Sequence, residues 1–286
     1  MEAAGARASA PASASASASP TALGDDIRHF VNLTVTLAVT EWKLRFFGSV
    51  LGYLWTLMRP LLLFGVLYVV FSHVVKVGTK IPHYPVYLLE SIVMFQFFAD
   101  STSQGLQSLL QRESLLRKMR FPRMVIPLSV VLTNLFNLGM NLIAVLVFVL
   151  VSGLSPRWTW LLVPVLVLAL IVLATGAAML TSALYVRFRD LAPIWEIVLQ
   201  ISFYASPVLY VISQVPSDFQ HPLAANPLGM VMTQMRKWVI DPHAPSAAAA
   251  IGGYAKLLIP IGVIVGVFAV GFWVFQRETP HIAENL

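Results

Sequence analysis

The sequence contains no cysteine and few charged residues, and each of these absences excludes a class of protein. Without cysteine there is no disulfide framework and no thiolate metal site, and cysteine usage says nothing about the compartment. Charged residues make up 11% of the 286 positions, whereas soluble domains carry about 25%. A soluble fold of this length would therefore have too few charges for its surface.

Short motifs that mark common enzymes are also missing. The chain has no GxxxxGKS/T loop for nucleotide phosphates, no GxSxG nucleophile elbow and no HExxH zinc motif. Its His residues are scattered, and no pair of carboxylates accompanies a nucleophile. We therefore predict that the chain is not an enzyme, has no catalytic or metal-binding residues, and binds no cofactor itself.

Long apolar runs are what the sequence has in abundance. Apolar residues make up 58% of the chain, and the mean hydropathy is +0.78. A helix needs about 20 mostly apolar residues to cross a bilayer. The segments that reach this length are roughly 51–75, 84–106, 125–151, 159–186, 191–212 and 256–276. The prediction is an all-α integral membrane protein with six transmembrane helices in a domain over 51–286.

Lys and Arg residues are concentrated in alternate connecting segments. Most of them lie in 25–50, 107–124, 187–190 and 277–286. Because cytoplasmic loops carry an excess of Lys and Arg, both termini are predicted to be cytoplasmic. The same rule explains the net charge of +6, so membrane lipids are the expected partner and nucleic acid is not.

The residues before the first span divide into two parts. Residues 1–24 are rich in Ala, Ser and Pro, and we expect a disordered cytoplasmic tail because such a segment buries too little apolar area to fold. Residues 25–50 predict an amphipathic helix on the cytoplasmic surface. Its apolar face would hold Ile27, Phe30, Val31, Thr34 and Leu37, followed by the interface residues Trp42, Lys43, Arg45 and Phe46.

The external stretch 213–255 is long for a loop between two spans. Asn226-Pro227 predicts a helix start, with Pro at the first helical position. Met230, Val231 and Met235 then recur at helical spacing, but the apolar stretch is too short to span. We predict external re-entrant helices before the last span.

The connection between the second and third spans combines a narrow apolar stripe with cations. Leu115, Leu116 and Met119 form the stripe, and Pro122 ends the short helix. Such a helix could dock into a groove of another protein while its cations pair with acidic groups there. The alternative is a loop whose positive charge only sets the orientation in the membrane. Residue spacing leaves both interpretations open.

Several spans carry polar or aromatic residues on one helical face, which would suit the lining of a polar path between the helices. The candidate lining residues are Tyr53, Phe64, Tyr68 and Phe71 on the first span, Gln96 and Asp100 on the second, and Glu196, Gln200, Phe203 and Tyr210 on the fifth. Ser103 and Gln107 continue the row on the second span, and the third carries Asn134, Asn137 and Asn141.

Helix-to-helix hydrogen bonding is the alternative role for these polar residues. We favour it for the Asn row, favour lining for the fifth span, and leave the Gln96 row open. Arg59, before Pro60, either reaches the cytoplasmic headgroups or lies at a substrate phosphate. Gly262-x-x-x-Gly266 either forms a close packing face or is an ordinary pair of glycines.

Three stretches in the same order carry a resemblance to a known family. They are GSVLGYLWTLMRPLL at 48–62, RKMRFPR followed by MVIPLSVV at 117–131, and RFRDLAPIWEIVLQISFYASPVLY at 187–210. Together they resemble the permease subunit of polysaccharide-exporting ABC transporters, which export O-antigen, capsule or teichoic acid. Among these permeases the chain looks most like the actinobacterial galactan exporters. Residues after 212 are only weakly covered.

The resemblance implies a homodimer of permeases in the bacterial cytoplasmic membrane, bound to two separate ATPase subunits. ATP and Mg would bind to those subunits, and the substrate would be a lipid-linked glycan. The resemblance further implies that Trp42, Lys43, Arg45 and Phe46 belong to an interface or gate helix. It also implies that the coupling helix contains Arg117, Lys118, Arg120, Phe121, Pro122 and Arg123.

Three other functions remain open at this stage. A permease of the same architecture could export a small drug or a lipid. An ion-coupled secondary transporter could use Asp100 and Glu196 as proton carriers without an ATPase. A membrane-embedded enzyme such as a glycosyltransferase is the third, and the lack of a clustered acid–base constellation argues against it.

Overall fold

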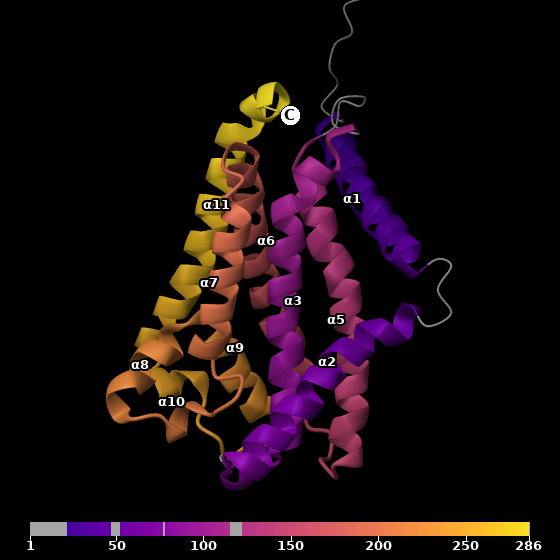
Figure 1. Cartoon of the computed structure of the whole chain (residues 1–286). Helices are drawn as coiled ribbons and strands as arrows, with labels where there is room; N and C mark the ends of the chain where they lie inside the picture. The colour runs from indigo at the N-terminus through magenta and orange to yellow at the C-terminus, as the bar shows by residue number, and fades with distance from the viewer. Residues whose placement is uncertain (1–21, 47–51, 77, 115–121, 286) are drawn as a thin grey trace, which may run out of the picture.

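The computed structural model describes residues 22–46, 52–76, 78–114 and 122–285, and the regular structure in these ranges is helical throughout. The predicted tail over 1–24 therefore lies almost entirely outside the described residues. The long helices are α1 (Ala22–Phe46), α2 (Gly52–Val69), α3 (Tyr84–Gln111), α5 (Val125–Val151), α6 (Val163–Arg187), α7 (Leu191–Ala205) and α11 (Leu258–Asn285). Three short helices, α8 (Ser217–Ala225), α9 (Pro227–Met235) and α10 (Ala247–Ile251), gather at one end of the bundle (Figure 1).

Four helical segments in the described part of the chain are long and apolar enough to cross a membrane. They are Leu54–Val74, Val125–Val151, Trp158–Arg187 and Ala255–Glu278, and they coincide with four of the predicted spans. α3 is 28 residues long but carries Glu90 and Asp100, which lower its apolar character. The chain is an integral membrane protein, and a crossing by α3 and α7 stays a prediction.

The helix in the fifth predicted span, 191–212, is shorter than predicted, because α7 ends at Ala205. Ser206 is extended, with φ −99° and ψ 148°, as expected for the residue before a proline. The chain that follows is non-helical and mostly buried, and its carbonyl oxygens accept hydrogen bonds from two tyrosines of α3. Tyr84 donates to Leu209 at 3.0 Å, and Tyr87 donates to Pro207 and, at 2.8 Å, to Tyr210.

α9 begins where the sequence predicts a helix start. The side chain of Asn226 accepts a hydrogen bond from the backbone N–H of Leu228 at 3.0 Å, and Pro227 occupies the first turn. The helix lies against α3 and α6, and most of its side chains are buried. The prediction of a short helix that starts at Pro227 is confirmed, and its re-entrant position in a membrane stays a prediction.

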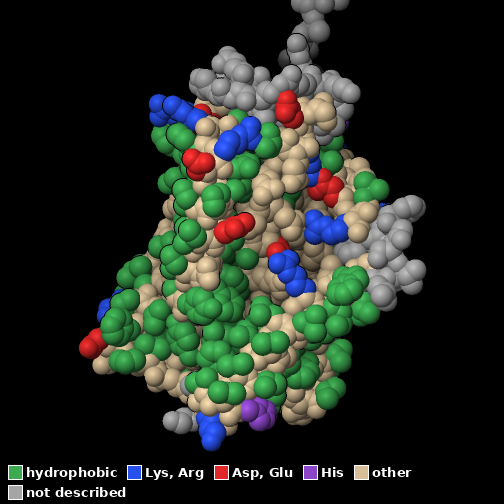
Figure 2. Space-filling view, viewed as in Figure 1, with side chains coloured by type: hydrophobic (Ala, Val, Ile, Leu, Met, Phe, Trp, Pro, Cys, Tyr) green, Lys and Arg blue, Asp and Glu red, His purple; other side chains and the backbone are tan. Residues whose placement is uncertain are grey.

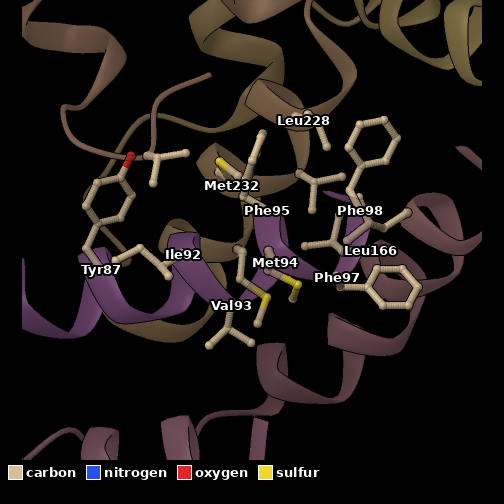
Figure 3. Close-up of a cluster of buried hydrophobic side chains, with 14 of the residues drawn as sticks. Tyr87, Ile92, Val93, Met94, Phe95, Phe97, Phe98, Leu166, Leu228 and Met232 are labelled. Carbon is tan, nitrogen blue, oxygen red and sulfur yellow. The ribbon is translucent and has the colours of Figure 1, made fainter. Parts of the chain in front are cut away.

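The core surrounds α3, which packs against α5, α6 and α7. Figure 3 shows Ile92, Met94 and Phe98 of α3 among Leu166 of α6 and Leu228 of α9. These side chains are at most 7% exposed. α3 is therefore the central helix, and every residue on its less buried faces is positioned by this core.

α6 and α11 approach each other most closely at two glycines. A Cβ at Gly176 would lie 2.5 Å from the backbone Cα of Phe268, and a Cβ at Gly271 would collide with the carbonyl oxygen of Gly176. Open space surrounds both Gly262 and Gly266. Within the described chain, the close packing face of α11 therefore lies at Gly271 rather than at the predicted pair.

α1 packs lengthwise against α5, with Thr34 and Ala38 buried in the contact. Ile27 and Val31 are 61% and 49% exposed on another side of the helix. The single apolar face predicted for this helix is therefore divided between a helix contact and an exposed stripe. The start of α1 and the end of α11 lie at the same end of the bundle (Figure 1), which agrees with termini on one side of a membrane.

Candidate functional site

Two adjoining cavities form a cleft on one side of α3. The first, which we call the polar cavity, has a volume of about 340 Å³ and lies between α1, α2, α3 and α5. The second, the apolar cavity, has a volume of about 580 Å³ and lies between α2, α3 and α7. Arg59, Gln96 and Asp100 line both. In Figure 2 charged side chains gather mainly on the upper half of the face that carries α3, and hydrophobic ones cover most of its lower half.

The floor of the polar cavity is a stripe on α3 that repeats every four residues. It consists of Gln96, Asp100 and Gln104, which the helical repeat places on one face. The sequence prediction continued this row through Ser103 and Gln107. Gln107 is instead exposed and accepts a hydrogen bond from Gln111 at 3.1 Å. A search of the sequence at the spacing i, i+4 and i+8 from Gln96 would have identified Gln104.

Two arginines from other helices reach over this stripe. Nη1 of Arg59 on α2 lies 3.6 Å from Oδ1 of Asp100. Nη2 of Arg45 on α1 donates to Oε1 of Gln104 at 2.8 Å. The Arg59 side chain is 74% exposed, so its other donors remain accessible from the cleft. The cavity thus contains two guanidinium groups and one carboxylate. This excess of positive charge favours the binding of an anionic group of a ligand.

The Asn row of α5 closes the polar cavity and also joins helices. Asn134 donates to Gln104 at 3.3 Å, and Asn137 accepts from Nε1 of Trp42 at 3.1 Å. Both residues line the polar cavity, as does Asn141. Hydrogen bonding between helices, which we favoured for this row, is confirmed for Asn134 and Asn137. Asn134 is buried, whereas Asn137 and Asn141 are half-buried and can contact a molecule in the cavity.

The buried amide of Gln96 is incompletely bonded. Its Oε1 has no hydrogen-bond partner among the residues described, although the atom is buried. An unpaired buried acceptor costs about 1–3 kcal/mol.

The aromatic face predicted on the first span lies mostly outside the cleft. Phe64 stacks on Tyr68 with ring centroids 5.7 Å apart and meets Phe148 of α5 at the same distance. These rings and Phe71 pack against the hydrophobic core. The predicted lining residues Phe64, Tyr68 and Phe71 line neither cavity. The side chain of Tyr53 lies outside the described residues.

α7 contributes one predicted residue to the cleft. Phe203 lines the apolar cavity and meets Phe95 edge-on at 5.0 Å. Glu196 and Gln200 are exposed and line neither cavity. Tyr210 lies beyond the helix end and donates to the carbonyl of Tyr204 at 3.1 Å.

The predicted coupling segment is described only at its end. Arg117, Lys118, Arg120 and Phe121 lie outside the described residues, whereas Pro122 is exposed and Arg123 half-buried. On α1, Trp42 and Arg45 contact α5 and α3, Lys43 is exposed, and the side chain of Phe46 is outside the described part. The segment joins α3 to α5 at the end of the bundle where α1 begins (Figure 1).

Sequence reasoning missed one ion pair beside this segment. Nη2 of Arg112, the residue that follows α3, pairs with Oε1 of Glu41 on α1. Nη1 of Arg112 donates to Oγ of Ser129 on α5 at 3.0 Å. Burial lowers the pKa of the Arg112 guanidinium to about 10, so this group remains charged at neutral pH.

The two parts of the cleft suit different parts of an amphiphilic molecule. Arg45, Arg59 and the amides would bind anionic and hydroxyl groups in the polar cavity. Leu62, Leu63 and Val66 of α2 line the apolar cavity beside Phe203. A lipid with a phosphorylated, sugar-bearing headgroup has both kinds of surface.

Comparison with known proteins is consistent with this geometry. Residues 32–239 match the ABC-2 type transporter family. The chain is 30% identical to the O-antigen export system permease protein RfbA of Myxococcus xanthus over 267 residues, which cover 91% of this chain and 98% of the relative. Two proteins of the same description from Klebsiella pneumoniae are 28% and 29% identical over 262 residues, with 91% of this chain and 97% of theirs covered.

Proposed function

The chain belongs to the ABC-2 type transporter family, and from this membership we propose that it is the permease of an ATP-driven exporter of a lipid-linked polysaccharide. The observation that carries the proposal is the similarity to O-antigen export permeases along 91% of the chain. The substrate would leave across the bacterial cytoplasmic membrane, with both termini of the permease on the cytoplasmic side. The resemblance of the sequence to actinobacterial galactan exporters makes a galactan the proposed glycan.

The cleft supports an amphiphilic substrate of this kind. Its polar cavity offers two guanidinium groups and a row of amides, and sugars and phosphates are recognised by such donors. Its apolar cavity adjoins directly and is open along α2, whose span is only 6% buried. Headgroup and hydrocarbon chain could therefore occupy the cleft together.

The exposed polar face of α7 supports a homodimer. Glu196 and Gln200 are exposed in the single chain, yet an ionised carboxylate is costly in contact with lipid. Ile197 and Ile201 on the same helix are 57% and 62% exposed. A second copy facing Glu196 and Gln200 would enclose the polar side and leave the aliphatic side to lipid.

An ATPase partner would supply the energy, because the sequence holds no phosphate loop of its own. Arg117–Arg123 would form the contact, with its cations paired to acidic groups of the ATPase. The double variant Arg120→Glu with Arg123→Glu should then reduce co-purification of the ATPase, because like charges would face each other. Arg157→Glu, on the predicted external side, is the matched control for a charge reversal.

Transport itself is tested with the permease and its candidate ATPase in proteoliposomes. ATP-dependent movement of a lipid-linked glycan is the expected result. Movement of a lipid without a glycan would favour the lipid exporter of the same architecture. Transport driven by a proton gradient with no ATPase present would refute the proposal.

A further inference from the structure

Arg112 lies where three helices meet. It directly follows α3, pairs with Glu41 of α1 and donates to Ser129 of α5. Its side chain is 16% exposed and that of Glu41 is 26% exposed, so little water competes for the pair. Ser129 in turn donates to the carbonyl of Ile126 at 2.8 Å. One guanidinium thus joins α1 to the beginning of α5 and the end of α3.

The remaining contacts show that α1 follows α5 along its length. Thr133 donates to the carbonyl of Ala38 at 3.3 Å, and Trp42 donates to Asn137 at 3.1 Å. Both pairs are separated by 95 residues in the sequence, so the two helices run parallel in constant register. These bonds join uncharged groups, and charge-assisted bonds such as those of Arg112 are roughly twice as strong.

The last turn of α1 forms one wall of the polar cavity. Arg45 lines this cavity and donates to Gln104 on its floor. Arg45 lies one helical turn beyond Glu41, so a displacement of Glu41 along the helix axis moves Arg45 as well. The ion pair at Arg112 and the cavity wall are therefore parts of one rigid element.

We propose that Arg112 is a positioning residue that makes α1 follow the cytoplasmic connection between α3 and α5. The inference rests on the proposed function, because the ATPase would be the source of the movement. When the ATPase displaces the segment after Arg112, the guanidinium carries Glu41 with it, and α1 shifts its Arg45 relative to Gln104. The opening of the polar cavity then changes in step with the ATP cycle.

The test uses the absence of cysteine in the chain. Asn141→Cys places one thiol in the polar cavity, and a water-soluble maleimide reports its accessibility in the permease–ATPase complex with and without a non-hydrolysable ATP analogue. This reporter is combined with Arg112→Met, with Glu41→Gln, and with the exchange Glu41→Arg plus Arg112→Glu. Gln111→Ala is the control, because Gln111 is exposed at the same helix end and, among the described residues, its side chain bonds only to Gln107 of the same helix.

The expected result is that the nucleotide changes the labelling rate in the parent and in the control. Arg112→Met and Glu41→Gln should bind the ATPase and hydrolyse ATP but lose this change, and the exchanged pair should regain it. A residue that only stabilises the fold would lower the melting temperature and leave the nucleotide response intact. An unchanged response in both single variants would overturn the inference alone. If the parent permease recruits no ATPase, the proposed function fails and the inference fails with it.

Discussion

Arg59 carries a charge into the middle of the cleft on a side chain that is 74% exposed. Its distance of 3.6 Å from Asp100 makes the pair comparable to surface ion pairs, which contribute about 0–1 kcal/mol. The pair is therefore a weak source of stability. A phosphate could replace Asp100 as the partner of Arg59 at little cost.

Arg59→Met should separate the two roles. The melting temperature should change little, whereas transport should fall, because an anionic headgroup would lose a charge-assisted bond. Arg59→Lys keeps the charge and should retain part of the activity. Thermal unfolding in detergent and transport in proteoliposomes measure the two effects. A large loss of stability with normal transport would show that the pair is structural.

Phe203 and Ile201 provide a comparison on one helix. Phe203 lines the apolar cavity, whereas Ile201 is 62% exposed and predicted to face lipid. An aromatic contact contributes about 0.5–1.5 kcal/mol, so Phe203→Ala should slow transport by up to about tenfold. Ile201→Ala should have little effect. Leu209 is not a suitable control, because it is only 6% exposed and its truncation would leave a cavity.

At the scale of elements, the contact of α6 with α11 depends on the absence of two side chains. Gly176 and Gly271 let the two backbones touch, and no flexible side chain is present at the point of contact to make room. α11 itself contains the last predicted span. Separation of α6 and α11 would therefore disturb the whole C-terminal part of the bundle.

Gly271→Ala should destabilise the protein by about 1–3 kcal/mol, because an added methyl group forces the backbones apart. Gly266→Ala meets open space, and Ala is the better helix former by about 1 kcal/mol. The control should therefore be neutral or slightly stabilising. Thermal unfolding of both variants in the same detergent decides. Equal melting temperatures would show that α6 and α11 can separate without loss.

At the scale of the whole molecule, six crossings require that α3 and α7 also span the membrane. Polar and acidic residues on α3 keep it outside the set of apolar spans, and α7 has only 15 residues. A helix of this length covers about 22 Å at 1.5 Å per residue, less than the roughly 30 Å hydrocarbon core. The buried, non-helical segment after Ala205 would have to complete the crossing.

Single cysteines test this topology in a chain that has none of its own. Ser155→Cys and Ser217→Cys should react with an impermeant maleimide on intact cells, because both positions are exposed and predicted to be external. Ser114→Cys and Asp190→Cys are equally exposed and should react only after permeabilisation. Protection of Ser217→Cys on intact cells would mean that α7 does not cross.

The sequence by itself determined the class of the protein and several elements. Composition and apolar run length depend only on local residues, so four spans and the helix start at Pro227 followed directly. Helical periodicity states which residues share a face but not which neighbour that face meets. The aromatic face of α2 therefore turned out to pack on the core, and Gln104 was missed in favour of Gln107.

Only the tertiary structure decided which distant residues meet in the cleft. Arg45 and Gln104 are 59 residues apart in the sequence, yet they are hydrogen-bonded. Glu41 on α1 and Arg112 after α3 are also far apart in the sequence, yet they form an ion pair. Such contacts depend on the packing of α1, α3 and α5 around a shared core. No local pattern specifies that packing, because it is the sum of many buried contacts between segments.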